Sequence, residues 1–347
     1  MLRVKGKKYS QKRCFWLLKT ERGKMTRRII IKSCIIYYCN LLKTKFIQRY
    51  VARYDSHTYS RYFEKQRNYC SRKTATANQA NEEISRRILG GKPLMVARYG
   101  SVELYGLEIF DLEYVPKYEI ALHTLTVNAG FFPGNVESGK KFARVLTEAS
   151  RKVDLLAFWN MFREEYYIKH LMSLDTGLIP LRFLEPWFSD HPWTTALAGK
   201  KVLVIHPYAE TIEKQYMKRE KLFKNHDILP EFQLHTLKAV QSMGGECEAF
   251  DTWFDALDWM TEEALKIEFD VALIGCGAYG MPLAARIKDA GRQAIHMGGV
   301  LQILFGIKGK RWDTDPVVSK LYNDAWVRPD DKDKPKVADK VEGGCYW

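Results

Sequence analysis

A glycine-rich turn late in the sequence has the residue types and spacing of an anion-binding site. Gly275, Gly277 and Gly280 follow the apolar run 269–274, which has the composition of a strand buried on both faces of a parallel sheet. Pro282 comes next, where proline favours the first turn of a helix. Glycines let backbone amides approach a ligand closely, and amides at a helix start attract phosphate. This segment therefore predicts a nucleotide-type site.

A second strand-to-helix turn of the same kind follows. Residues 293–297 have the pattern of a strand, and Gly298 and Gly299 lead into another helical start. Beyond it, segment 305–312 carries three cations among glycines, which would neutralise a diphosphate or would simply form an exposed turn. The predicted ligand contacts from both turns are Gly275, Gly277, Tyr279, Gly280, His296, Gly298, Gly299, Gln302 and Lys308.

An earlier strand-to-helix turn carries an arginine and an acid. A strand is predicted over 93–98, and the segment Arg98-Tyr99-Gly100-Ser101-Val102-Glu103 leads from its end into a helix. Parallel sheets bind ligands at the carboxyl ends of their strands, so Arg98, Gly100 and Glu103 are further candidates for the site. The alternative for Arg98 and Glu103 is a local ion pair.

His206 and Glu210 follow another clear strand, 202–205, and are candidates for phosphate contact or acid–base work. Glu210 would equally suit the first turn of a helix, where a carboxylate is favourable. The sequence does not assign a general base; His206, Glu210 and Asp251 are the candidates.

The order G-x-G-x-x-G after a strand also suggests a dinucleotide cofactor. Two features oppose it. The strand that should end in an acidic residue for the ribose hydroxyls ends instead in His296-Met297-Gly298, and the motif comes late in the chain rather than in its first unit. A methyltransferase would lack the same acid, and an NADP site would depend on Arg292.

The other patterns predict an α/β fold. Helices are expected over 81–89, 137–153 and 257–267, and further strands over 154–159, 181–187 and 245–250. We therefore expect residues 81–328 to form a Rossmann-like, doubly wound and mostly parallel sheet, followed by a polar tail over 329–347. With 347 residues and 46% apolar content, the chain can bury a large core.

Positive charge is concentrated at the amino end. Residues 1–80 hold 21 Lys or Arg and three acidic residues, whereas the remainder holds 34 basic and 38 acidic residues. We expect residues 1–80 to form a basic helical extension. Residues 1–54 would rest on an anionic membrane or, alternatively, form a solvated arm or a partner contact. The basic residues match no nucleic-acid-binding module, so no nucleic acid is expected.

The remaining indications favour the cytoplasm. Lys32 interrupts the apolar stretch 29–42, which is too short to span a membrane, and no cleavage site of a signal peptide follows. The seven cysteines are scattered without a CxxC pair, which favours a reducing compartment. The protein would be cytoplasmic, and peripheral at the inner membrane face if its basic extension binds there.

The segment Arg98–Glu103 resembles the R-[FY]-G-D-G-E segment near the start of the GT-D type glycosyltransferases. The late glycine turn, with Ala294-Ile295-His296-Met297-Gly298-Gly299, resembles their closing strand, turn and helix. The likeness covers roughly residues 80–315. It implies a nucleoside-diphosphate sugar, commonly UDP-linked, as donor, a glycan or lipid-linked acceptor, and a role in assembling bacterial surface polysaccharide or glycoprotein.

The resemblance also implies a divalent metal held by a DxE motif. Glu103 matches the second acid, but Ser101 stands where the first would be. A neutral hydroxyl binds Mn²⁺ or Mg²⁺ more weakly than a carboxylate does, so metal would be held loosely, or the reaction would proceed without it. Two alternatives remain: a non-catalytic nucleotide-sugar-binding or assembly protein, and an NAD(P)-dependent oxidoreductase.

Overall fold

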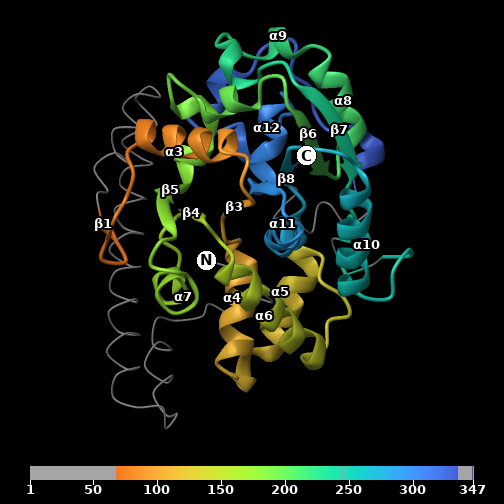
Figure 1. The fold of residues 1–347 in the computed structure, drawn as a ribbon. Helices are drawn as coiled ribbons and strands as arrows, with labels where there is room; N and C mark the ends of the chain where they lie inside the picture. Colours follow the sequence, from red (N-terminus) through yellow and green to blue (C-terminus); the bar gives the residue numbers. More distant parts are fainter. Residues whose placement is uncertain (1–67, 243, 246, 335–345, 347) are drawn as a thin grey trace.

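The computed structural model describes residues 68–242, 244–245, 247–334 and 346. Their centre is a seven-stranded parallel sheet in the order β5-β4-β3-β9-β8-β6-β7 (Figure 1). This confirms the predicted Rossmann-like α/β class. The strands are β3 (Leu94–Ala97), β4 (Leu155–Phe158), β5 (Gly177–Pro180), β6 (Lys201–His206), β7 (Gln233–Lys238), β8 (Val271–Ile274) and β9 (Gln293–His296).

Helices cover both faces of this sheet (Figure 1). Apolar side chains of α4, α5, α6, α7, α10 and α11 pack on one face, and those of α3, α8, α9 and α12 on the other. The strands supply both cores because successive side chains point to opposite faces. The helices are α3 (Ala77–Leu89), α4 (Ser101–Asp111), α5 (Tyr118–Ala129), α6 (Val136–Arg151), α7 (Glu164–Leu171), α8 (Ala209–Tyr216), α9 (Arg219–Leu222), α10 (Trp253–Lys266), α11 (Gly280–Asp289) and α12 (Leu301–Leu304).

Local sequence fixes where several helices begin. Asn135 caps α6 by accepting a hydrogen bond from the Ser138 amide at 2.9 Å. Thr252 and Asp255 form a reciprocal capping box at the start of α10. Such caps satisfy amides that have no partner within the helix, and each contributes about 1 kcal/mol.

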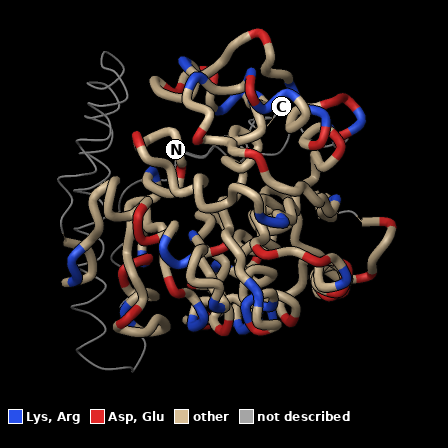
Figure 2. The backbone as a smooth tube through the Cα atoms, turned by 45° about the horizontal axis from the view of Figure 1, so that its top comes forward, with Lys and Arg blue, Asp and Glu red and all other residues tan. Residues whose placement is uncertain are grey.

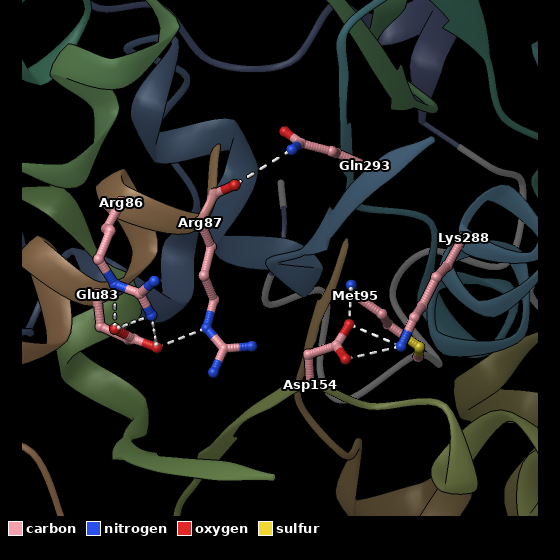
Figure 3. A network of polar contacts seen from close by, with 7 residues as sticks. All are labelled: Glu83, Arg86, Arg87, Met95, Asp154, Lys288 and Gln293. Atoms are coloured by element: carbon pink, nitrogen blue, oxygen red, sulfur yellow. Dashed lines mark hydrogen bonds and ion pairs between the residues drawn. The ribbon is translucent and has the colours of Figure 1, made fainter. Parts of the chain in front are cut away.

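Polar contacts tie the amino ends of the central strands together (Figure 3). The Asp154 carboxylate, just before β4, accepts hydrogen bonds from the Met95 amide in β3 and from Nζ of Lys288, each at 2.8 Å. Nε2 of Gln293, the first residue of β9, donates to the Arg87 carbonyl at 3.2 Å. These bonds fix strand register at the amino-terminal edge of the sheet. The opposite edge is the one where a doubly wound sheet binds ligands.

Two of the strand predictions are wrong. Residues 181–187 form two short 3₁₀ turns, Leu181–Leu184 and Pro186–Phe188, and the strand is β5 just before them. β5 is an edge strand that pairs only with β4, and a terminal proline is tolerated at an edge because its missing N–H breaks no bond to a further strand.

The second strand expected, 245–250, is also absent from the described residues of that stretch. Gly244 and Gly245 have φ of +89° and +81°, which an extended strand cannot adopt. The strand at this end of the sheet is β7, whose half-exposed, mixed composition hides it from an apolar pattern.

Predictions for both ends of the chain fall largely outside the described residues. The basic extension 1–80 is described only from residue 68, where a hairpin of β1 (Asn68–Tyr69) and β2 (Arg72–Lys73) places Tyr69 in the core against Phe158. Residues 68–80 thus pack on the domain predicted to begin at 81. Of the tail, 329–334 and 346 are described.

Charge is mixed over the described surface. Figure 2 shows Lys and Arg interspersed with Asp and Glu along the outer helices. Among the described helices, none is long and apolar enough to cross a membrane. The proposed membrane contact through residues 1–54 lies outside the described residues and stays a prediction.

Candidate functional site

β3 and β9 are parallel neighbours at the centre of the sheet, and the connections that follow them run to opposite faces. The helix that follows β3, α4, packs on one face of the sheet, and the one that follows β9, α12, packs on the other. Connections that diverge in this way leave a crevice at the carboxyl ends of the two strands, where doubly wound sheets bind ligands. Arg98 follows β3, and Gly298 follows β9.

Arg98 is half-buried at the carboxyl end of β3. A Cβ atom on Gly298 would lie 3.0 Å from its Nη1, and its Cζ lies 5.1 Å from the ring centre of Trp159. Arg98 makes no hydrogen bond or ion pair with another described residue, so the alternative of a local ion pair with Glu103 is not realised. Among the described residues, the guanidinium thus has an aromatic neighbour but no carboxylate partner.

Glu103 and Ser101 lie in the first turn of α4. The Glu103 carboxylate folds back over Gly100, into the space that a Cβ there would occupy. Ser101 is exposed. No group of three or more His, Cys, Asp and Glu side chains gathers anywhere in the described part of the chain, so these two residues supply a single carboxylate. A cation here would take its other ligands from phosphate and water, as Mg²⁺ often does.

The glycines of the first turn have different roles. Gly275 is buried, and a Cβ there would lie 2.8 Å from both the Gly298 carbonyl oxygen and Cδ2 of His206. Gly280 lies flat against the His296 ring, which a Cβ would overlap. Both glycines are thus required for packing between neighbouring elements. Gly277 is exposed with φ +58°, and a Cβ there would meet only the Ala129 carbonyl oxygen, at 4.0 Å, so it presents its backbone to solvent.

Tyr279, a predicted ligand contact, belongs to the core. It is 2% exposed, stacks on Trp253 with ring centres 4.9 Å apart, and its hydroxyl lies 2.8 Å from Oγ of Ser242. Ser242 in turn donates to the Gly130 carbonyl at 2.7 Å. The side chain anchors the turn from behind, and any ligand contact by Tyr279 would involve its backbone.

The two histidines at the strand ends are buried and neutral. Burial lowers the pKa of His206 to about 3, and burial together with the Arg98 charge lowers the pKa of His296 to about 3. Nδ1 of His206 accepts the Tyr208 amide hydrogen at 3.0 Å, which places the ring proton on Nε2. A general base works best with a pKa near the operating pH, so burial makes His206 a poor proton acceptor.

Glu210 lies apart from Arg98. It is exposed in the first turn of α8, where it pairs with Lys332 and approaches Lys238 at 3.9 Å. The hydrogen bond and the charge of Lys332 lower its pKa. β6, which precedes it, is three strand spacings from β3, roughly 14 Å. The structure therefore does not bring Glu210 together with Arg98.

The second glycine turn is covered on one side. Gly298 has φ +71° and is buried against Arg98. The ring of Tyr346 occupies the space beside Gly299, and the Tyr346 hydroxyl accepts a hydrogen bond from Arg311 Nη1 at 3.1 Å. The face of Gly299 that was predicted to meet a ligand is thus in contact with the end of the chain.

Gln302 and Lys308 also have internal partners. Nε2 of Gln302 donates to the carbonyls of Ile307 and Lys308, each at 3.2 Å, and so closes the loop after α12. Nζ of Lys308 lies 5.3 Å from the ring centre of Tyr322. Gln302 is 1% exposed and Lys308 is half-buried, so the first holds the loop and the second remains near its surface.

Trp159 was not singled out by the sequence. It follows β4, the other neighbour of β3, and is 38% exposed. Its Nε1 donates to the Tyr99 carbonyl at 3.0 Å, which fixes the indole beside Arg98. The available signal was its position directly after a buried strand.

A buried carboxylate shapes the loop that carries Trp159. Glu164 is fully buried and accepts the amide hydrogens of Trp159 and Met161, each at 3.2 Å. Burial raises its pKa to about 7 against the lowering effect of these bonds. Asn160 and Arg163 in the same loop have φ of +58° and +64°, a conformation that costs non-glycine residues free energy and that clusters at functional sites.

Comparison with known proteins yields one structural neighbour. No family model matches the chain, and no curated protein does. Among solved structures, the selenomethionine-substituted structure of a domain of unknown function 1792 is similar at 12% identity and a TM-score of 0.35, covering 73% of this chain and 96% of that one. This similarity is too weak to transfer a function.

Proposed function

We propose that this protein is a glycosyltransferase that takes a sugar from a nucleoside diphosphate, UDP in the first instance, and passes it to a glycan or lipid-linked acceptor. The observation that carries the proposal is Arg98: a half-buried guanidinium with no described ion-pair partner, at the carboxyl end of β3 beside its neighbour β9. A partly desolvated guanidinium without a counter-ion gains charge-assisted hydrogen bonds when an anion binds to it. A diphosphate is such an anion.

The surrounding residues suit a departing diphosphate. Gly277 presents exposed backbone at the turn before the ten-residue helix α11, and Gly298 lies directly against Arg98. Glycosyl transfer leaves negative charge on the diphosphate, and fixed donors stabilise that charge without reorganising. The segment Arg98–Glu103, which resembles the glycosyltransferase motif, spans the end of β3 and the first turn of α4. Its location supports transfer from a nucleotide sugar over simple phosphate binding.

Glu103 would serve the reaction in one of two ways. It would either ligate Mn²⁺ or Mg²⁺ together with the diphosphate and water, or contact the sugar directly after swinging away from Gly100. The carboxylate is at the end of a flexible side chain, so both arrangements are within its reach.

A second candidate is a non-catalytic nucleotide-sugar-binding protein. Ser101 at the position of the expected acid, and the single carboxylate that the motif supplies, favour it. An NAD(P) oxidoreductase has less support, because β9 ends at the buried His296 and offers no acid to the ribose hydroxyls.

The test is binding followed by turnover with the full chain. Calorimetry would measure UDP-, GDP-, CMP- and dTDP-sugars and NAD(P), each with and without Mn²⁺. One sugar nucleotide should bind, and Arg98→Gln should weaken it at least tenfold, while Arg151→Gln, at an exposed position on α6, should leave the affinity unchanged. Release of free nucleoside diphosphate with a lipid-linked acceptor would establish transfer. Binding without release would favour the second candidate, and binding of NAD(P) alone would refute both.

A further inference from the structure

We infer that Trp159 and Arg98 together form a subsite for a nucleoside diphosphate, in which the indole stacks on the nucleobase and the guanidinium holds the diphosphate. The inference rests on the proposed function and adds the part of the ligand that each residue recognises. In the described part of the chain, Trp159 is the aromatic residue that makes a cation–π contact with Arg98.

The two residues come from adjacent parallel strands. β3 and β4 pair with Ala97 opposite Leu156, so Arg98 is level with Ala157 and Trp159 lies two residues further along, at the same carboxyl edge of the sheet. The guanidinium carbon lies 5.1 Å from the indole centre, within the range of a cation–π contact. Such a contact leaves the guanidinium N–H donors available to phosphate oxygens.

The exposure of Trp159 sets it apart from its own strand. The four residues of β4 are at most 1% exposed, whereas Trp159 directly after them is 38% exposed. Part of its indole surface is therefore open to solvent beside Arg98. Its indole is already fixed through the Nε1 bond to the Tyr99 carbonyl, so stacking on it would cost little side-chain entropy.

Buried polar contacts fix the loop that follows Trp159. The Glu164 carboxylate gathers the amides of Trp159 and Met161, and buried Arg163 pairs with Glu108 at 3.0 Å. Two non-glycine residues with positive φ are kept in place by these contacts. Strain maintained by buried polar groups is typical of segments that position a functional side chain.

A nucleoside diphosphate matches the pair because it joins a planar aromatic ring to an anion. The base would take the indole face that Arg98 does not cover, since stacking tolerates any base, and the diphosphate would take the guanidinium. A sugar phosphate, which has no base, would bind the guanidinium but could not stack on the indole.

The experiment separates the two halves of the ligand. Calorimetry on the full chain would compare the best binder among UDP, GDP, CDP and dTDP with inorganic pyrophosphate, which has no base. Trp159→Leu should weaken the nucleotide about tenfold, which corresponds to about 1.4 kcal/mol, and should leave pyrophosphate within twofold of wild type. Arg98→Gln should weaken both. Trp159→Phe, which keeps a ring, should retain most of the nucleotide affinity.

Trp259 provides the matched control. It is 36% exposed on α10, and Trp259→Leu should change neither affinity. The inference is overturned if Trp159→Leu binds the nucleotide as wild type does, or if it weakens pyrophosphate to the same degree. If the wild-type chain binds no nucleoside diphosphate, the proposed function fails and the subsite with it. If circular dichroism shows that Trp159→Leu does not fold, Trp159→Phe replaces it. Nucleotide binding should then quench less tryptophan fluorescence in Trp159→Phe than in wild type, and equal quenching would overturn the inference.

Discussion

A Cβ atom on Gly298 would lie 3.0 Å from Nη1 of Arg98, so the backbone after β9 and the side chain after β3 are in direct contact. This relationship joins two residues that are 200 positions apart in the sequence. It also explains why the second glycine turn belongs to the candidate site although Tyr346 covers its outer side.

Gly298→Ala should destabilise the protein and weaken anion binding. The residue has φ +71°, which costs a side-chain-bearing residue about 1–2 kcal/mol, and the new methyl group would push against Arg98. Urea denaturation would measure the first effect, and calorimetry with a nucleotide the second. Gly291→Ala is the matched control, because Gly291 has φ +82° with nothing within 4 Å of its Cβ position. It should lose similar stability and keep the affinity; equal affinities for both variants would contradict the role of the Arg98 contact.

Gly280→Ala should cost more stability than Gly277→Ala. A methyl group at position 280 overlaps the buried His296 ring, and forced overpacking costs about 1–3 kcal/mol, whereas Gly277 has open space and only a positive φ of +58° to accommodate. Shortening the ring partner in the double variant Gly280→Ala with His296→Ser should recover part of the loss. Strictly additive losses in denaturant unfolding would show that the two residues do not press on each other.

Glu164 should make stability fall as pH rises from about 4.5 to 7. Burial raises its pKa from 4.5 in the unfolded chain to about 7, so the folded state holds its proton through this window and must ionise a buried carboxyl above it. The contribution is present below pH 4.5 and is lost as pH passes 7, by about 3 kcal/mol. The difference in unfolding free energy between wild type and Glu164→Gln should therefore decrease across the window. A constant difference would contradict the raised pKa.

Buried His206 should make stability fall as pH decreases, the opposite of the effect of Glu164. Burial lowers its pKa from 6.5 to about 3, so below pH 6.5 the unfolded state takes up a proton that the folded state does not. Its contribution is full above pH 6.5 and shrinks as pH falls toward 3, by about 4–5 kcal/mol. Asparagine could still accept the Tyr208 amide hydrogen, so His206→Asn should flatten this part of the acid profile. An unchanged slope in urea melts between pH 6.5 and 4 would refute it.

The elements around the site were predictable where a local pattern is strong. The run before Gly275 has the apolar composition of a fully buried strand, and the segment 293–297 is apolar apart from Gln293 and His296; both contain strands of the central sheet. The two edge strands escaped this test for different reasons: β7 is half-exposed, and β5 ends in Pro180, a residue that is tolerated at a sheet edge but not in a central strand.

The sequence by itself determined the parallel α/β class, the two glycine turns and the placing of Arg98 at a strand end, because these depend on periodicity and on glycine and proline conformations, which act over a few residues. The tertiary structure decided which of these residues meet. Strand order put β3 beside β9 and β4, and so brought Arg98 to Gly298 and Trp159, while His206, His296 and Tyr279 were buried and Glu210 was left apart. Pairing of distant strands and burial are properties of the whole core, and no local stretch of sequence specifies them.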